Sequence, residues 1–194
     1  LMPTSDWTDA ETLAIMKQHQ PAFEAGQGWA YVNANFIILG MIVELVNGRP
    51  TRDVLQTDIL DPLGLTQTSY PTTAKMPEPY ANGHAYTTGL FGGWAWQEAT
   101  ETGPGYASWA GSMISTAHDL LLWAKELRDG TLLSPEMHAM RTECYWPIPW
   151  GNDDQLTYFG YGHGMFELGQ WRGHGGSWRG YEVSCYYLPN GTLF

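Results

Sequence analysis

The chain is poor in charge, above all positive charge, and in long apolar runs. Charged residues make up 15% of its 194 residues, with nine Lys or Arg against 20 Asp or Glu and a net charge of −11. No basic run is present to neutralise phosphates, so we expect no nucleic-acid partner. No apolar stretch reaches the roughly 18 residues of a membrane span. The densest run, 36–46, is interrupted by Gly40 and Glu44.

Cysteine is also scarce. Cys144 and Cys185 are the only two, and neither has a partner at metal-binding or C-x-x-C spacing. Two buried thiols and one disulfide therefore both stay open. The six histidines show no paired spacing such as H-E-x-x-H, so no metal and no other cofactor is expected. The chain begins with Leu1 and not Met, so we expect the interior of a longer protein, and the lack of a signal peptide excludes no compartment.

Aromatic residues, by contrast, are abundant: ten Trp and eleven Tyr in a chain that is 43% apolar. The length and composition predict one globular domain with a real core. Many aromatic rings with few charges suit a cleft that grips organic ligands or sugars, although rings also simply fill cores.

Helix caps organise the first three quarters of the chain. Thr8 to Glu11 is a capping box, Thr116 precedes an apolar helical pattern, and Ser134 is followed by Pro135. The predicted helices cover 9–20, 33–46, 50–60, 117–130 and a last one from 135. The second is apolar on nearly all sides and therefore expected to be buried, with Asn33 or Asn35 as its N-cap. The third is expected to stop at Asp61-Pro62. Residues 66–105 are rich in Gly, Pro and Thr and predict a loop that covers a cleft.

The last part of the chain has the pattern of strands. Candidates cover 158–168, 171–175 and 181–188, followed by the turn signal Pro189-Asn190-Gly191-Thr192. The fold class predicted is therefore α+β, with a helical region over 1–145 and antiparallel strands over 157–194. We expect a single, incomplete domain, because the sheet begins but is not completed before residue 194.

Tyr31 and Asn33 precede the apolar helix and are the first candidate site. Residues i and i+2 share a side in an extended lead-in. A phenol is a poor base at neutral pH, but a nearby cation would lower its pKa and make the phenolate usable. The amide of Asn33 suits a substrate amide or a lysine. Alone, however, Tyr-x-Asn also fits a helix cap beside a packed tyrosine.

The segment from Arg172 to Tyr181, RGHGGSWRGY, is the second candidate site. Several glycines in one strand imply that something approaches the backbone closely. A strand edge with free N–H groups can supply an oxyanion donor, and Ser177 is the natural position for it. His174 suits a ligand contact, an electrostatic helper or a satisfied core group.

Taken together, these boxes resemble the serine β-lactamase and penicillin-recognising superfamily. The similarity is greatest to class C-type β-lactamases, D-alanyl-D-alanine carboxypeptidases and related esterases. Four segments carry it: Gly28 to Phe36 (the "YSN" box), Leu60 to Thr68 ("PLGMxxT"), Ala110 to Leu120 ("AGGxxSTxxDL") and His174-Gly175-Gly176 ("HTG" or "KTG"). The resemblance covers about residues 20–190 and implies the β-lactamase/transpeptidase-like fold, with both ends truncated relative to the family.

The resemblance also implies roles. In the family a serine of a Ser-x-x-Lys motif forms an acyl-enzyme, which water hydrolyses. Tyr31 would shuttle protons with that lysine, and Asn33 would hold the substrate amide. His174 would line the opposite wall and support the proton network, with Gly175 and Gly176 beside the substrate. Ser177 would donate its N–H to the oxyanion, and Tyr106 would be an aromatic wall residue.

The sequence departs from the family pattern at two points. It has no Ser-x-x-Lys; Thr72-x-x-Lys75 has the spacing but follows the Tyr-x-Asn box, and we reject it. Gly175 replaces the usual Thr, which removes a hydroxyl from the carboxylate-binding wall and leaves esterase activity open. We therefore expect a serine acyl-hydrolase whose nucleophile is not in this chain, which alone should be inactive.

The expected partner is a small-molecule or peptide substrate with an ester or amide carbonyl. The alternatives are a non-catalytic module of the same fold that binds peptide or glycan, and an aromatic-rich carbohydrate-binding domain. The resemblance favours a periplasmic or extracellular location, whereas an esterase would fit the cytoplasm. The sequence predicts no oligomeric state.

Overall fold

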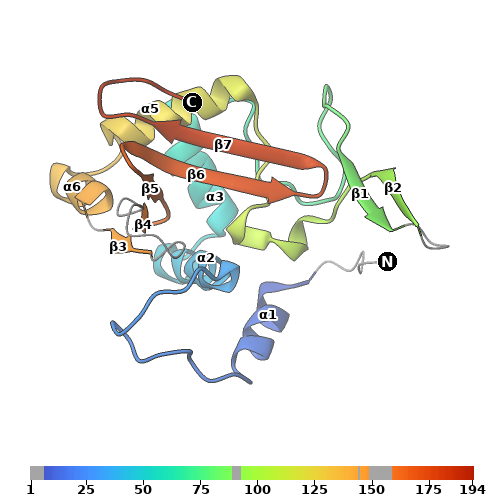
Figure 1. Ribbon diagram of the computed structural model, residues 1–194, viewed down its shortest axis with the longest axis horizontal. Helices are drawn as coiled ribbons and strands as arrows, with labels where there is room; N and C mark the ends of the chain where they lie inside the picture. Colours follow the sequence, from blue (N-terminus) through green and yellow to red (C-terminus); the bar gives the residue numbers. More distant parts are fainter. Residues whose placement is uncertain (1–6, 89–92, 144, 149–158) are drawn as a thin grey trace. The chain divides into compact units, whose positions relative to one another are not determined.

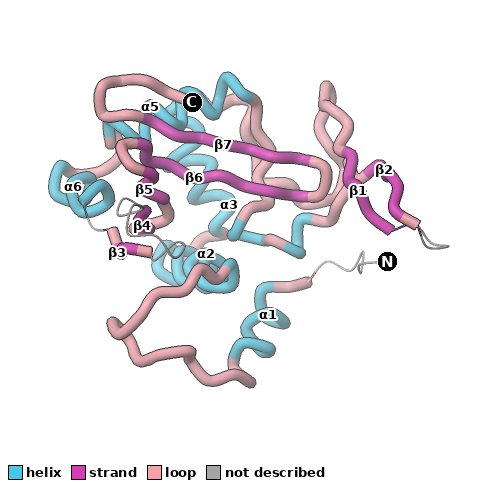
Figure 2. The backbone as a smooth tube through the Cα atoms, in the orientation of Figure 1, coloured by secondary structure: helices cyan, strands magenta, loops and turns pink. Residues whose placement is uncertain are grey.

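The computed structural model describes residues 7–88, 93–143, 145–148 and 159–194 (Figure 1). Its contacts divide the chain into two compact units, each built from several stretches of sequence. The first comprises Leu1–Asp58, Ser69–Ile114 and Ser177–Glu182, and the second Ile59–Thr68, Ser115–Gly176 and Val183–Phe194. Helices and antiparallel strands occur in both units (Figure 2), which confirms the predicted α+β class.

Three helices begin where their predicted caps lie. Thr8 and Glu11 form the reciprocal hydrogen bonds of a capping box before α1 (Asp9–Met16), which ends earlier than the predicted residue 20. The hydroxyl of Thr116 accepts a hydrogen bond from the backbone N–H of Asp119 at the start of α5 (Ala117–Asp129). The hydroxyl of Ser134 caps α6 (Pro135–Glu143) in the same way. Local hydrogen-bonding chemistry therefore sets these helix starts.

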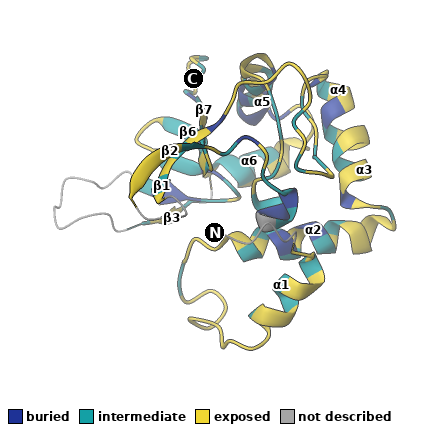
Figure 3. Cartoon of the chain, turned by 90° about the vertical axis from the view of Figure 1, so that its right-hand side faces the viewer, coloured by how far each residue is buried: buried dark blue, intermediate teal, exposed yellow. Residues whose placement is uncertain are grey.

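Helix α2 (Asn33–Asn47) ends at Gly48, as predicted, in the left-handed conformation with φ 64°. The predicted burial on nearly all sides is wrong: Leu45 is 82% exposed and Val46 76% exposed (Figure 3). An all-round apolar helix is buried only if neighbours cover every side, and in the described residues the buried positions of α2 are Ile37 and Gly40. None of the described residues therefore covers Leu45 and Val46.

The next helical segment passes the proline that was predicted to stop it. Helix α3 (Thr51–Leu55) leads into the π-helical η1 (Gln56–Leu60) and then α4 (Asp61–Leu63). Pro62 lies in the first turn of α4, where a missing N–H is tolerated. Gly64, with φ 67°, ends the segment instead.

The predicted cover loop, 66–105, contains regular structure. Strands β1 (His84–Thr88) and β2 (Trp94–Glu98) pair antiparallel, with Tyr86 opposite Trp96. The 3-10 turns η2 (Pro104–Tyr106) and η3 (Ser108–Ala110) follow. The sequence did not predict this hairpin, because the aromatic side chains of its strands are exposed. In most antiparallel sheets the apolar side chains face the core instead.

A five-stranded sheet in the order β3-β4-β5-β6-β7 follows the helices. Its first four strands pair antiparallel with one another, and β6 and β7 are joined by a two-residue turn. Phe194 also pairs with Tyr186 through two backbone hydrogen bonds, so the chain turns back after β7 as predicted. The prediction of adjacent antiparallel strands is thus confirmed from residue 159 on. The strands are β3 (Trp146–Pro147), β4 (Phe159–Tyr161), β5 (Phe166–Leu168), β6 (Trp171–Trp178) and β7 (Tyr181–Tyr187).

The core of the second unit lies between α5 and the sheet. Leu127 of α5, Met165 and Tyr187 of β7 are buried against one another. Cys185 is a buried free thiol whose burial raises its pKa to about 11. Cys144 lies outside the described residues.

Candidate functional site

Tyr31 and Asn33 lie at the entry to α2. Val32 between them is extended (φ −140°, ψ 116°), so both side chains leave the backbone on the same side. Val32 is also the N-cap and makes no side-chain cap, so the prediction of Asn33 or Asn35 as the cap is wrong. Tyr31 is 42% exposed and Asn33 is exposed. Partial burial raises the pKa of Tyr31 above the ordinary value of a tyrosine. Within the described part of the chain, the phenolate that would act as a base is therefore harder to form.

A buried contact fixes the position of α2 within the first unit. The indole of Trp109 rests on Gly40: a Cβ at Gly40 would lie 2.2 Å from the ring. The indole N–H of Trp109 donates to the carboxylate of Asp9 (2.7 Å), which also accepts from the hydroxyl of Ser108 (2.6 Å). Ser108 is held at φ 44°, a left-handed conformation that costs energy for a residue other than glycine. These contacts join α1, α2 and η3, and so position the helix that Asn33 begins.

The glycines of β6 are explained by its neighbour β7. A Cβ at Gly173, where φ is 154°, would lie 2.0 Å from the carbonyl oxygen of Cys185. A Cβ at Gly175 would lie 3.3 Å from the Val183 carbonyl oxygen, and one at Gly176 would lie 3.0 Å from the Val183 side chain. The predicted close approach is therefore real, but what approaches these positions is a strand.

His174 is half-buried in β6. Its Nδ1 lies 2.5 Å from the carbonyl oxygen of Gly175, which can only accept, so Nδ1 carries a proton. Its Nε2 lies 3.4 Å from the hydroxyl of Tyr161, and the ring packs on Phe166 with centroids 4.8 Å apart. Burial lowers the pKa of His174, and the hydrogen bond to Gly175 opposes part of this effect. The neutral imidazole with Nε2 as acceptor is the form that this arrangement favours.

Tyr161 is a candidate site residue that the sequence did not reveal. It is 8% exposed in β4 and makes edge contacts with both Phe166 and His174. The available signal was its position in the aromatic segment 158–168, which precedes the glycine-rich segment.

Ser177 lies near the end of β6, and its side chain is already engaged. Its hydroxyl donates to the carboxylate of Glu182 on β7 (2.6 Å), so its backbone N–H is the group left for an oxyanion role. Tyr106 ends η2, but its side chain lies outside what the structure describes. Tyr31, Asn33 and Ser177 belong to the first unit, and His174, Gly175 and Gly176 to the second. Their convergence on one cleft stays a prediction.

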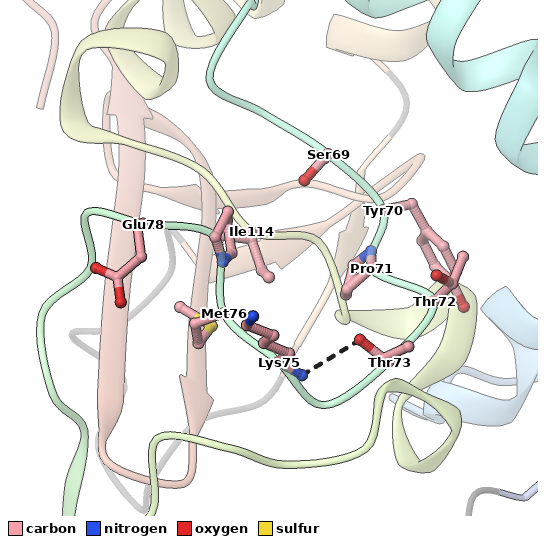
Figure 4. A pocket seen from close by; sticks show the side chains of 10 residues that line it. Ser69, Tyr70, Pro71, Thr72, Thr73, Lys75, Met76, Glu78 and Ile114 are labelled. Atoms are coloured by element: carbon pink, nitrogen blue, oxygen red, sulfur yellow. Dashed lines mark hydrogen bonds between the residues drawn. The ribbon is translucent and has the colours of Figure 1, made fainter.

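An open cavity of about 430 Å³ lies in the first unit (Figure 4). Two of its lining residues, Ser69 and Ile114, form an antiparallel β-bridge with two backbone hydrogen bonds of 2.9 Å. Thr72 and Lys75 are both exposed here, and the backbone N–H of Lys75 donates to the hydroxyl of Thr73 (3.3 Å). The predicted site residues are not among those that line it. The lining residues are Ser69, Tyr70, Pro71, Thr72, Thr73, Lys75, Met76, Pro77, Glu78 and Ile114.

Within the described part of the chain, no group of three or more His, Cys, Asp or Glu side chains is arranged to hold a metal ion. Over the same residues, no helix has both the length and the apolar character needed to cross a membrane.

Comparison with known proteins gives a consistent result. The family model described as Beta-lactamase matches residues 2–193. Penicillin-binding protein 4* of Bacillus subtilis (strain 168) is 26% identical over 173 residues, which make up 83% of this chain and 37% of that protein.

Solved structures also match nearly the whole chain. A D-stereospecific amidohydrolase from Streptomyces sp. superposes with a TM-score of 0.84 at 28% identity, over 97% of this chain and 55% of the other. A D-amino acid amidase from Ochrobactrum anthropi SV3, complexed with D-phenylalanine, gives 0.82 at 23% identity, over 99% and 57%. The β-lactamase/transpeptidase-like fold is thereby confirmed, and the chain spans little more than half the length of these structures.

Proposed function

Because the chain belongs to the β-lactamase family, we propose that it forms part of a serine hydrolase that transfers an acyl group from an ester or amide to water. The family match over residues 2–193 carries this proposal, since it spans the Tyr31-x-Asn33 box and the His174-Gly175-Gly176 segment. No serine of the sequence has a lysine three residues after it. The nucleophile is therefore supplied from outside these 194 residues.

In the proposed reaction the serine oxygen attacks the carbonyl carbon of the substrate, and Tyr31 takes up the serine proton. Tyr31 then returns the proton to the leaving alcohol or amine as its bond to the carbonyl carbon breaks. Water then attacks the carbonyl carbon of the acyl-enzyme and gives a proton to Tyr31, which returns it to the serine oxygen as the serine ester bond breaks and the carboxylic acid leaves. Because burial raises the pKa of Tyr31, the phenolate needs a cation beside it, which the lysine of the missing motif provides.

His174 and Ser177 support the opposite wall of the proposed site. The lowered pKa of His174 keeps its ring neutral near pH 7, so Nε2 can accept a hydrogen bond within the proton network. The backbone N–H of Ser177 stabilises the oxyanion, while its hydroxyl stays hydrogen-bonded to Glu182.

Gly175 narrows the substrate class. It offers no side-chain hydroxyl to a substrate carboxylate, and the Val183 carbonyl oxygen, which would lie 3.3 Å from a Cβ at this position, leaves little space for one. We therefore favour amides and esters without a free carboxylate on the leaving side. The amidohydrolase at 28% identity acts D-stereospecifically, which supports D-amino acid derivatives as the acyl donor.

The test uses the full gene product that contains these residues. We expect it to hydrolyse the p-nitroanilide or p-nitrophenyl ester of D-phenylalanine faster than that of L-phenylalanine, and faster than nitrocefin. Tyr31→Phe should lower kcat/KM by about a hundredfold or more, the effect of losing a general base.

The matched control is Tyr80→Phe, which removes a phenol hydroxyl from another tyrosine of similar exposure, 38% against 42%. It should leave turnover unchanged. Full activity in Tyr31→Phe would overturn the proposal, as would steady turnover by the isolated 194 residues, since that would require a nucleophile within them.

A further inference from the structure

The carboxylate of Asp9, in the first turn of α1, binds a turn that lies far away in the sequence. Its Oδ1 accepts a hydrogen bond from the hydroxyl of Ser108 (2.6 Å), and its Oδ2 accepts one from the indole N–H of Trp109 (2.7 Å). Both donors belong to η3, and all three residues lie in the first unit. Hydrogen bonds to a charged acceptor are stronger than neutral ones, so this carboxylate fixes η3 against the start of α1.

The turn that Asp9 holds is strained. Ser108 is 4% exposed and has a φ of 44°, in the left-handed region that residues other than glycine avoid. Such a conformation persists only where the surrounding structure enforces it, and it is found most often at functional sites. Loss of the Asp9 carboxylate would remove an acceptor from the Ser108 hydroxyl and allow the backbone of the turn to relax.

Trp109 transmits the effect of Asp9 to α2. Its ring lies so close to Gly40 that a Cβ there would be 2.2 Å away, and it stacks on Tyr70 with the centroids 4.3 Å apart. Gly40 follows Asn33 by seven positions, and residues at this spacing share one face of a helix. The indole therefore packs on the face of α2 that begins with Asn33, the residue proposed to hold the substrate amide.

The held turn also continues directly from the predicted aromatic wall residue. Tyr106 ends η2, and η3 begins at Ser108. The hydroxyl of Ser112 donates to the carbonyl oxygen of Pro104 (2.5 Å), which joins the two ends of this η2–η3 segment. Asp9 thus binds a segment that carries one predicted site residue and packs on the helix that carries another. A displacement of about 1 Å in a site can lower a rate about a hundredfold, because reacting groups must be aligned.

We propose that Asp9 is a positioning residue for acyl transfer. Its carboxylate holds Ser108 and Trp109, and through them it keeps the start of α2 and the η2–η3 segment in the geometry that the reaction needs. This inference rests on the proposed function, and one of the two measurements below requires no turnover.

The first measurement is the hydrolysis of the p-nitroanilide of D-phenylalanine by the full gene product. Asp9→Ala removes both hydrogen bonds and should lower kcat by about ten- to a hundredfold, with a smaller change in KM. Asp9→Asn keeps an oxygen for the indole N–H and offers the Ser108 hydroxyl an NH2 donor, so it should retain most of the activity. Trp109→Phe leaves a ring on Gly40 without the N–H, and its kcat should lie between these two.

Glu11→Ala is the matched control. It removes another carboxylate from the first turn of α1, one whose hydrogen bonds go to Thr8 in the capping box. It should lower the melting temperature and leave the kcat of the folded protein unchanged. A merely structural role for Asp9 would give this same pattern in Asp9→Ala.

The second measurement is hydrogen–deuterium exchange, followed by mass spectrometry over residues 29–42 and 103–112. Asp9→Ala should raise the exchange rate of both segments, whereas Glu11→Ala should raise neither. If the full gene product hydrolyses no such substrate, the proposed function fails, and raised exchange in Asp9→Ala still supports the positioning role.

Two results would overturn the inference. One is an Asp9→Ala protein with wild-type exchange in both segments or with wild-type kcat. The other is an equal loss of kcat in Asp9→Ala and Glu11→Ala, which would assign the effect to α1 as a whole.

Discussion

Asp119 should be an important carboxylate for the stability of the second unit. It is 1% exposed at the start of α5, and its Oδ2 accepts hydrogen bonds from the Gln67 backbone N–H and the Thr68 hydroxyl, each at 2.8 Å. These bonds tie the segment after α4 to α5. A hydrogen bond to a charged group contributes about 1.5–3 kcal/mol, so Asp119→Ala should cost about 3–6 kcal/mol. Asp119→Asn keeps an acceptor but loses the charge, and should cost about half as much.

Urea unfolding followed by tryptophan fluorescence measures both losses. The matched control is Asp129→Asn at the other end of α5, where the carboxylate pairs with Arg128 at 2.6 Å in an exposed ion pair. Such a pair contributes little, so this control should leave the unfolding midpoint nearly unchanged. An Asp119→Ala variant that is no more destabilised than the control would show that these hydrogen bonds do not hold the segment after α4 to α5.

Three further predictions concern the second unit and its neighbours. Because burial lowers the pKa of His174, the unfolded chain takes up a proton at a higher pH than the folded chain does. The free energy of unfolding should therefore fall as the pH drops from about 7.5 to about 5. His174→Gln should flatten this dependence, which is measured by urea unfolding at each pH. Gly173→Ala should reduce the melting temperature far more than Gly111→Ala, since a Cβ would lie 2.0 Å from a backbone carbonyl at the first position and meets nothing within 4 Å at the second; equal melting temperatures would contradict the close strand contact. In a Cys144→Ser background, iodoacetamide should label Cys185 only after denaturation, because burial raises the pKa of its thiol to about 11; rapid labelling of the native protein, measured by mass spectrometry, would show that the thiol is accessible.

Local sequence determined where three helices begin and where α2 ends. The capping box at Thr8, the N-caps at Thr116 and Ser134, and the left-handed stop at Gly48 all form as predicted. Each depends on side chains within a few residues of the helix end, and for that reason a single sequence is enough to find it. The aromatic and glycine pattern also predicted strands after residue 158, but the single candidate 158–168 is two paired strands, β4 and β5, and the candidate 171–175 extends to Trp178.

Tertiary contacts decided what local pattern could not. The burial of α2 depends on which neighbours cover it, so an apolar stretch that predicts a buried helix leaves Leu45 and Val46 exposed among the described residues. Gly173 of β6 is required by β7, whose backbone leaves no room for a Cβ, and Gly175 and Gly176 lie in tight contact with the same strand. Tyr161 contacts His174 only because β4, β5 and β6 lie side by side in the sheet.

The candidate site divides in the same way. The sequence alone was enough to propose Tyr31, Asn33, His174 and Ser177 as candidates, because short motifs carry chemistry in their residue types and spacing. It could not give the hydrogen bond that fixes the tautomer of His174, or the Glu182 carboxylate that engages the Ser177 hydroxyl. Those depend on strand register, which is set by the packing of the whole sheet and by no single segment of it.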